Sequence, residues 1–209
     1  MKKFFLFISI IILCSIFLQA QNTSFILTIS KDIHNTSEEK FLAHSGDGAF
    51  DSYLIQNLPF LPVKALYQDL EKKLNTKLIS RGEAHITVIT PVEYYNVLKS
   101  HISIQEIDKI AKDMKIQEAP FKIVCLGRGQ TIMDKEIEST YYIVVEAKRL
   151  IEIRKAIWEI YVSKGGNQDD FNPDYYYPHI TVGFTKRDLH ESDGVIKDKN
   201  SHFACIVEE

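Results

Sequence analysis

The sequence predicts a fold of mixed helices and strands in which one strand–helix–strand unit occurs twice. The tetrapeptide His-Ile-Thr-Val appears at residues 85–88 and again at residues 179–182. Each copy follows an amphipathic helix, and each of those helices follows a strand-like segment. Because a pattern that recurs at such a distance indicates a repeated structural unit, we expect the two copies to be related by a pseudo-twofold axis.

The first half of the chain supplies the first unit. Residues 24–30, SFILTIS, read as a strand, and a polar stretch and the loop HSGDG complete an N-terminal extension at residues 21–47. Residues 52–58, SYLIQNL, form the next expected strand. The helix after it has an apolar face with a helical period, made of Val63, Leu66, Tyr67, Leu70 and Leu74.

The second half follows the same order. We expect helices near residues 92–98 and 103–114 and strands at residues 121–126 and 140–147. The strongest helix comes next, with Leu150, Ile153, Ile157 and Tyr161 on one face and Gly165 and Gly166 placed to end it. In the C-terminal tail, residues 189–209, the segment FACIV predicts an edge strand.

Composition limits the classes of protein that remain. The chain has 209 residues, 45% of them apolar, which suits a single globular domain. Its formal net charge of −3 argues against bulk coating of nucleic acid, although a small anionic ligand in a local cleft remains allowed. No HExxH, CxxC or histidine cluster has metal-ligand spacing, so we expect neither a metal nor a cofactor.

Residues 1–20 have the layout of a secretory signal peptide: two lysines, an apolar run, and Ala20 before a polar residue. The alternative is a retained membrane anchor, and Leu13 before Cys14 fits a lipoprotein cleavage site poorly. We therefore expect an exported protein that meets a membrane only if this segment stays uncleaved. Whether Cys125 and Cys205 pair stays open.

Both repeated strands have one apolar and one polar face, because alternate side chains on a strand point to opposite sides. Arg81, Glu83, His85 and Thr87 share one side of the first copy, and Tyr175, Tyr177, His179 and Thr181 share one side of the second. Any half-buried strand alternates in this way, so one copy alone would indicate little. His101 and Ser103 imitate the motif, but Ser103 with Glu106 three residues later is typical of a helix cap.

Two such strands side by side would present two imidazoles and two hydroxyls to one cleft, a set that suits phosphoryl transfer without a metal. One of His85 and His179 can accept a proton while the other donates one, and the hydroxyls of Thr87 and Thr181 can donate to phosphate oxygens. Glu83 is expected to orient His85.

Tyr177 is expected to do the same for His179, more weakly. A solvent-facing carboxylate at Glu83 and a core tyrosine at Tyr177 are the alternatives.

The stretches RGEAHITVIT (residues 81–90) and YYPHITVGF (residues 176–184) resemble the two-histidine, or 2H, phosphoesterase superfamily, which includes 2′-5′ RNA ligase-like proteins and cyclic nucleotide phosphodiesterases. They look most like its Swiss Army Knife branch, over roughly residues 48–188. The resemblance implies a bilobal α+β fold with an antiparallel sheet in each lobe, helices outside and a central groove that holds both motifs. We expect a monomer.

The resemblance also implies hydrolysis, or reversible transesterification, of 2′,3′-cyclic phosphates and related linkages on nucleotides or RNA ends. His85 and His179 become acid and base, with His179 expected as the base in hydrolysis. Further anion contacts are expected from Arg81, while Arg128 is more simply a solvated loop residue. Base-stacking candidates near the second motif are Phe171, Tyr175 and Tyr176.

Two other interpretations compete with this enzyme. The first is a non-catalytic module that binds nucleotides or anions in the same groove, and the second is a secreted structural domain with coincidental motifs. Proton-transfer groups in both copies favour the enzyme, because a binding module does not need two of them.

Overall fold

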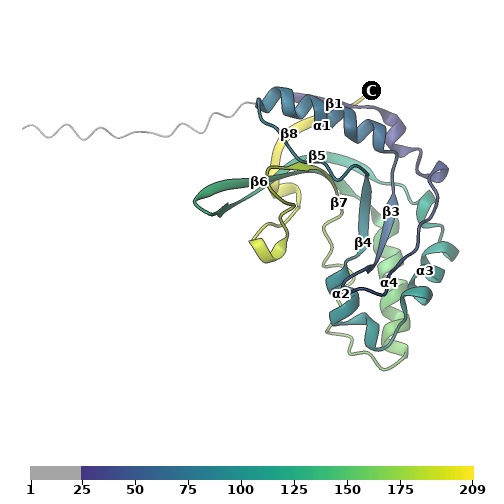
Figure 1. The fold of residues 1–209 in the computed structure, drawn as a ribbon. Helices are drawn as coiled ribbons and strands as arrows, with labels where there is room; N and C mark the ends of the chain where they lie inside the picture. Colours follow the sequence, from purple (N-terminus) through teal and green to yellow (C-terminus); the bar gives the residue numbers. More distant parts are fainter. Residues whose placement is uncertain (1–24) are drawn as a thin grey trace, which may run out of the picture.

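The computed structural model describes residues 25–209, so the signal peptide expected at residues 1–20 lies outside the described residues. Two sheets and four α-helices form the described chain, and Figure 1 shows the helices outside the sheets. None of the helices in residues 25–209 is long and apolar enough to cross a bilayer. The α+β fold class is therefore confirmed.

The larger sheet has five strands in the order β1-β8-β5-β6-β7. In this spatial order they span Ile26–Ile29, His202–Glu208, Lys122–Met133, Glu136–Glu146 and His179–Phe184. β1 and β8 pair in parallel, and every other neighbouring pair is antiparallel.

The smaller sheet has three antiparallel strands in the order β2-β3-β4. They span His44–Ser45, Ser52–Asn57 and His85–Ile89. The first His-Ile-Thr-Val copy thus lies in the smaller sheet, and the second copy begins β7 in the larger one.

The helices are α1 (Phe60–Leu74), α2 (Pro91–Asn96), α3 (Ile104–Asp113) and α4 (Lys148–Ser163), close to the expected ranges. Short 3-10 helices connect them at Lys31–His34, Thr36–Glu38, Leu98–Ser100, Ile116–Glu118, Glu191–Asp193 and Lys199–Ser201.

Local sequence sets where two of the helices begin. Thr90 and Glu93 form a capping box at α2, and Ser103 and Glu106 form another at α3. The cap expected at Ser103 is therefore confirmed. Because the Ser103 hydroxyl caps a helix, His101 and Ser103 are not a third copy of the motif.

The predicted strand–helix–strand repeat is present in the structure. β3-α1-β4 and β6-α4-β7 have the same order, and in each unit the flanking strands pair antiparallel with one irregularity in register. The helices pack across the units, since α1 contacts β7 and α4 contacts β4. The sheets themselves are unequal, with five and three strands, so the pseudo-twofold duplication of whole lobes stays a prediction.

One strand prediction is wrong. The tail segment forms β8, which lies between β1 and β5 instead of at an edge. The reason is that β1 from the N-terminal extension pairs with it in parallel, with Ile26 opposite Cys205 and Ile29 opposite Glu208. The extension and the tail therefore complete the larger sheet together.

The apolar faces of the two repeated strands lie in the main core, as their alternation predicts. Ile86 and Val88 of β4 and Ile180 and Val182 of β7 are all buried. The alternate side chains, which include both histidines and both threonines, are only partly buried. The fold thus leaves the polar face of each copy accessible.

Candidate active site

The polar faces of β4 and β7 meet where the two sheets approach each other. β4 is the last strand of the smaller sheet and β7 the last strand of the larger one, and the two strands are in contact (Figure 1). Burial is the main cause that lowers the pKa of His179, and the charge of His85 adds a weaker effect in the same direction. The structure therefore brings together the two histidines that the repeat predicts.

His85 is oriented by a carboxylate. Its Nδ1 lies 2.7 Å from Oε2 of Glu83, and because a carboxylate only accepts, Nδ1 carries the proton in this bond. Burial raises the pKa of Glu83, but the hydrogen bond and charge of His85, with Arg81 and His44, outweigh burial and lower it. Glu83 therefore remains a carboxylate, and Nε2 is left for other chemistry.

His179 is oriented by a backbone carbonyl. Its Nδ1 lies 2.8 Å from the carbonyl oxygen of Tyr177, so Nδ1 again carries the proton and Nε2 of the neutral ring has a free lone pair. Burial and then the charge of Lys197 lower the pKa of His179 to about 3, against weaker opposing effects of Tyr177 and Asp188. This imidazole is uncharged at neutral pH.

A buried carboxylate beside the second motif collects four donors. Asp188 accepts from Arg81 at 2.7 Å, Lys197 at 2.8 Å, Thr140 at 2.7 Å and Thr181 at 3.1 Å. Burial raises the pKa of Asp188, but Lys197 and these hydrogen bonds outweigh burial and hold it well below its usual range. Sequence reasoning missed both Asp188 and Lys197, because single polar residues in an irregular loop carry no periodic signal.

The two motif threonines differ in what their hydroxyls contact. Thr181 donates to Asp188, whereas the Thr87 hydroxyl has no hydrogen-bond partner within residues 25–209. Arg81 lies on the same side, but one of its terminal nitrogens is already bound to Asp188. Thr87 is thus the freer of the two expected phosphate donors.

The expected orientation of His179 by the Tyr177 side chain is wrong in one respect: the backbone carbonyl of Tyr177 makes the contact. The Tyr177 ring instead stands edge-on to Tyr175, with 5.2 Å between the ring centroids. Tyr175 is 52% exposed and remains available as a stacking surface.

Two of the expected base-stacking rings are occupied by the protein itself. Phe171 and Tyr176 each hold the Arg154 guanidinium 4.7 Å from their ring centroids, and Phe171 is buried. The Tyr176 hydroxyl also donates to the carbonyl oxygen of Thr87 at 2.8 Å. These two rings therefore pack on Arg154, and Tyr176 also binds β4, so neither ring is available to stack on a base.

Arg128 is likewise accounted for by a structural contact. Its guanidinium lies 4.4 Å from the ring centroid of Phe203, and Arg128 pairs with Tyr141 across β5 and β6. Tyr142, the next residue, faces His179, so Arg128 is on the opposite face of the sheet. The expected loop position of Arg128 is therefore wrong, because the residue lies within β5, with its side chain exposed on the face away from His179.

Arg154 connects the two copies. From α4 it donates to the carbonyl oxygen of Val88 in β4 at 2.7 Å, forms an ion pair with Glu93 at 2.8 Å, and donates to Pro173 at 3.0 Å. Its side chain is only 1% exposed. The segment that leads into β7 is thereby fastened to the strand that carries His85.

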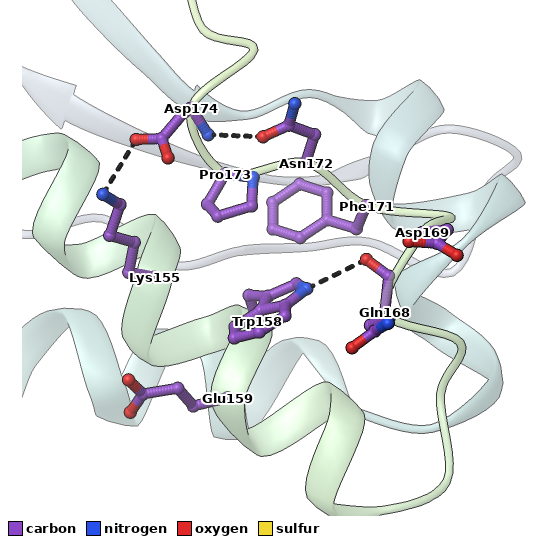
Figure 2. A pocket seen from close by; sticks show the side chains of 9 residues that line it. All are labelled: Lys155, Trp158, Glu159, Gln168, Asp169, Phe171, Asn172, Pro173 and Asp174. Atoms are coloured by element: carbon purple, nitrogen blue, oxygen red, sulfur yellow. Dashed lines mark hydrogen bonds and ion pairs between the residues drawn. The ribbon is translucent and has the colours of Figure 1, made fainter.

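A hollow of about 390 Å³ lies on the outer side of α4, behind this same segment. Figure 2 shows Trp158 donating to the carbonyl oxygen of Gln168 and Lys155 paired with Asp174 at its rim. Neither histidine nor threonine of the repeated motifs lines it, so we assign the chemistry to the β4–β7 face.

Across residues 25–209, no three or more His, Cys, Asp or Glu side chains are grouped so that they could hold a metal ion. Cys125 is buried and Cys205 is exposed, and both are free thiols in the structure.

The site thus consists of two histidines on contacting strands of the two sheets, each with its Nδ1 hydrogen-bonded. Residues 52–190 match the family described as Swiss Army Knife, 2H phosphoesterase domain, and this protein belongs to that family. The matched segment contains both motifs and Asp188, while Lys197 lies beyond it. No curated protein and no solved structure matches the chain.

Proposed function

We propose that this protein is a metal-independent phosphodiesterase that opens 2′,3′-cyclic phosphates, or cleaves 2′-5′ linkages, on nucleotides or RNA ends. The observation that carries the proposal is the pair of imidazoles at β4 and β7, oriented by unlike acceptors. An acid and a base in one site can serve both halves of a phosphoryl transfer.

His179 is the general base in this proposal. Its uncharged ring presents Nε2, which takes a proton from the attacking water as the new phosphorus–oxygen bond forms. Burial and the charge of Lys197 lower the pKa of His179, so the ring is uncharged and can accept a proton at neutral pH.

His85 is the general acid. The Glu83 carboxylate stabilises a positively charged imidazole, whose Nε2–H gives its proton to the leaving ribose oxygen as the bond from that oxygen to phosphorus breaks. The product is a phosphomonoester. His179 then releases its proton to solvent, and His85 takes one up from solvent, so both rings return to their starting state.

The phosphate is held by charge and by hydroxyl donors. Arg81 and Lys197 together exceed the single negative charge of Asp188, which leaves one net positive charge beside the motif. Thr87 is free to donate to a phosphate oxygen, and Thr181 could do so only by releasing Asp188. Tyr177 and Tyr175 offer apolar surface near the same opening.

The test is a panel of 2′,3′-cyclic nucleotides and 2′-5′-linked dinucleotides, incubated with the protein in EDTA. We expect turnover by the wild type and its loss in His85→Ala and His179→Ala. Binding without turnover in the wild type would instead establish the non-catalytic binding module. Absence of both binding and turnover would contradict both hypotheses.

We also propose that the protein is exported and acts as a monomer. The proposal of export rests on the sequence of residues 1–20. Cell fractionation, with the N-terminal residue of the mature chain determined, tests it: a chain that retains Met1 in the cytosolic fraction contradicts it. Size-exclusion chromatography with light scattering measures the oligomeric state.

A further inference from the structure

A buried lysine from the C-terminal tail lies against the second motif. The Lys197 side chain is 4% exposed, and its ammonium lies 2.8 Å from Oδ1 of Asp188 and 5.3 Å from the centroid of the Tyr142 ring. Lysine is almost never fully buried unless it is paired. Its burial here, outside the matched residues 52–190, calls for a role that the family match does not supply.

Both partners of Lys197 also contact the second motif. The Tyr142 ring stands edge-on to His179, with 5.8 Å between the ring centroids. Asp188 accepts a hydrogen bond from Thr181, two residues after His179. The ammonium and the imidazole therefore lie on the same face of β6 and β7.

We propose that Lys197 is a positioning residue for His179: its ammonium, fixed by Asp188 and Tyr142, opposes a second positive charge there and keeps the imidazole uncharged. Burial has the larger effect on the charge state of His179, and the contribution of Lys197 is argued from these contacts. The use of His179 as the catalytic base rests on the proposed function. A lysine that only completed the packing of the tail would leave the titration of His179 unchanged.

The other charges around His179 do not cancel this effect. Asp188 and the Tyr177 carbonyl favour a charged ring, and His85 opposes one. Asp188, however, is shared between Arg81 and Lys197, so the three together carry one net positive charge. The other titratable groups nearby are Arg187 and Asp193, which pair with each other, and His190, whose pKa is lowered mainly by burial.

The direct test is an NMR titration of the imidazoles in the whole mature chain, with the His179 signal assigned by its loss in His179→Gln. In the wild type we expect His179 to titrate well below the ordinary range of histidine. In Lys197→Met its pKa should rise by about one unit or more, because a nearby like charge has been removed.

Two variants control for folding and for overall charge. Lys199→Met removes the same charge from an exposed position two residues away and should leave His179 unchanged. Lys197→Arg keeps the charge and should keep the low pKa. A wild-type His179 that titrates in the ordinary range of histidine overturns the proposal even if Lys197→Met does not fold. An unchanged pKa of His179 in folded Lys197→Met overturns it as well.

Activity gives a second readout. His179 must be uncharged to accept a proton, so activity falls as the pH drops through its pKa, and a raised pKa makes that fall begin at higher pH. The acid limb of kcat with a 2′,3′-cyclic nucleotide should therefore move upward by the same amount in Lys197→Met. Absence of any turnover with the NMR shift intact would contradict the proposed function only; turnover with an unshifted His179 would contradict the role of Lys197 only.

Discussion

The two His-Ile-Thr-Val strands share four letters and differ in almost everything that touches them. In the first, His85 donates to the Glu83 carboxylate, whose side chain is 48% exposed, and the Thr87 hydroxyl is free. In the second, His179 donates to a backbone carbonyl, and the Thr181 hydroxyl is bound to a buried carboxylate. The same motif thus meets a charged acceptor in one copy and a neutral acceptor in the other.

The difference has a simple electrostatic origin. A carboxylate carries a full negative charge and stabilises an imidazolium, whereas a carbonyl offers only a dipole and orients the ring without fixing a charge on it. At His179 the balance is moved further toward the neutral ring by burial and by Lys197. A reaction that needs a donor and an acceptor together benefits from this inequality.

The largest expected effect comes from removing either imidazole. His85→Ala and His179→Ala should each lower kcat by about 10²- to 10⁴-fold, the usual contribution of a positioned acid or base. The measurement is initial rate on a 2′,3′-cyclic nucleotide, with His101→Ala as the matched control because His101 lies outside both motifs. Equal activity of His101→Ala and His85→Ala would refute the assignment.

The next largest effect is expected from replacing Arg154, which connects the two motif copies. Arg154→Met removes a buried guanidinium and leaves Glu93 and several carbonyl groups without their partner, so we expect a loss of about 3–5 kcal/mol in the free energy of unfolding. Denaturant titration measures it. Arg149→Met, which removes an exposed arginine from the same helix, should change stability by less than about 0.5 kcal/mol.

Exchanging the orienting groups tests the inequality itself. Glu83→Gln replaces the carboxylate that supports a charged His85, and we expect kcat to fall by about tenfold or more. Tyr177→Phe should leave kcat nearly unchanged, because the carbonyl that holds His179 belongs to the backbone. A larger loss in Tyr177→Phe than in Glu83→Gln would mean that the hydroxyl of Tyr177 acts on the substrate.

The threonines should separate binding from stability. Thr87→Val removes a free hydroxyl, so we expect KM to rise by about tenfold with little change in unfolding free energy. Thr181→Val breaks the bond to Asp188 and should cost about 1 kcal/mol of stability. Steady-state kinetics and thermal unfolding of both variants measure these effects. A raised KM without loss of stability in Thr181→Val would show that the Thr181 hydroxyl contacts the phosphate.

The sequence predicts well those features that follow a period. Strand alternation placed Ile86 and Ile180 in the core and both histidines on the opposite face, and the cap at Ser103 separated the decoy histidine from the real pair. The proximity of Glu83 to His85 followed from their spacing of two on one strand. Each of these inferences involves residues that are neighbours within one element.

What the sequence could not predict involves partners brought together by the chain path. Asp188 and Lys197 sit in irregular segments, and nothing in their spacing indicates that they meet beneath Thr181. The stacking of Phe171 and Tyr176 on Arg154 likewise depends on how α4 lies across β4. In the same way, a tail strand looks like an edge until its neighbour from the other end of the chain is known.

The pairing of β1 with β8 ties the N-terminal extension to the tail, with Leu27 opposite Ile206. A fragment cut at the limits of the matched family segment, residues 52–190, would lose both strands and leave β5 with an open backbone edge, which is a template for association with another chain. The same cut would discard Lys197. The smallest unit that preserves the contacts of Asp188 and the closed edge of β5 is therefore larger than the unit by which the family is recognised.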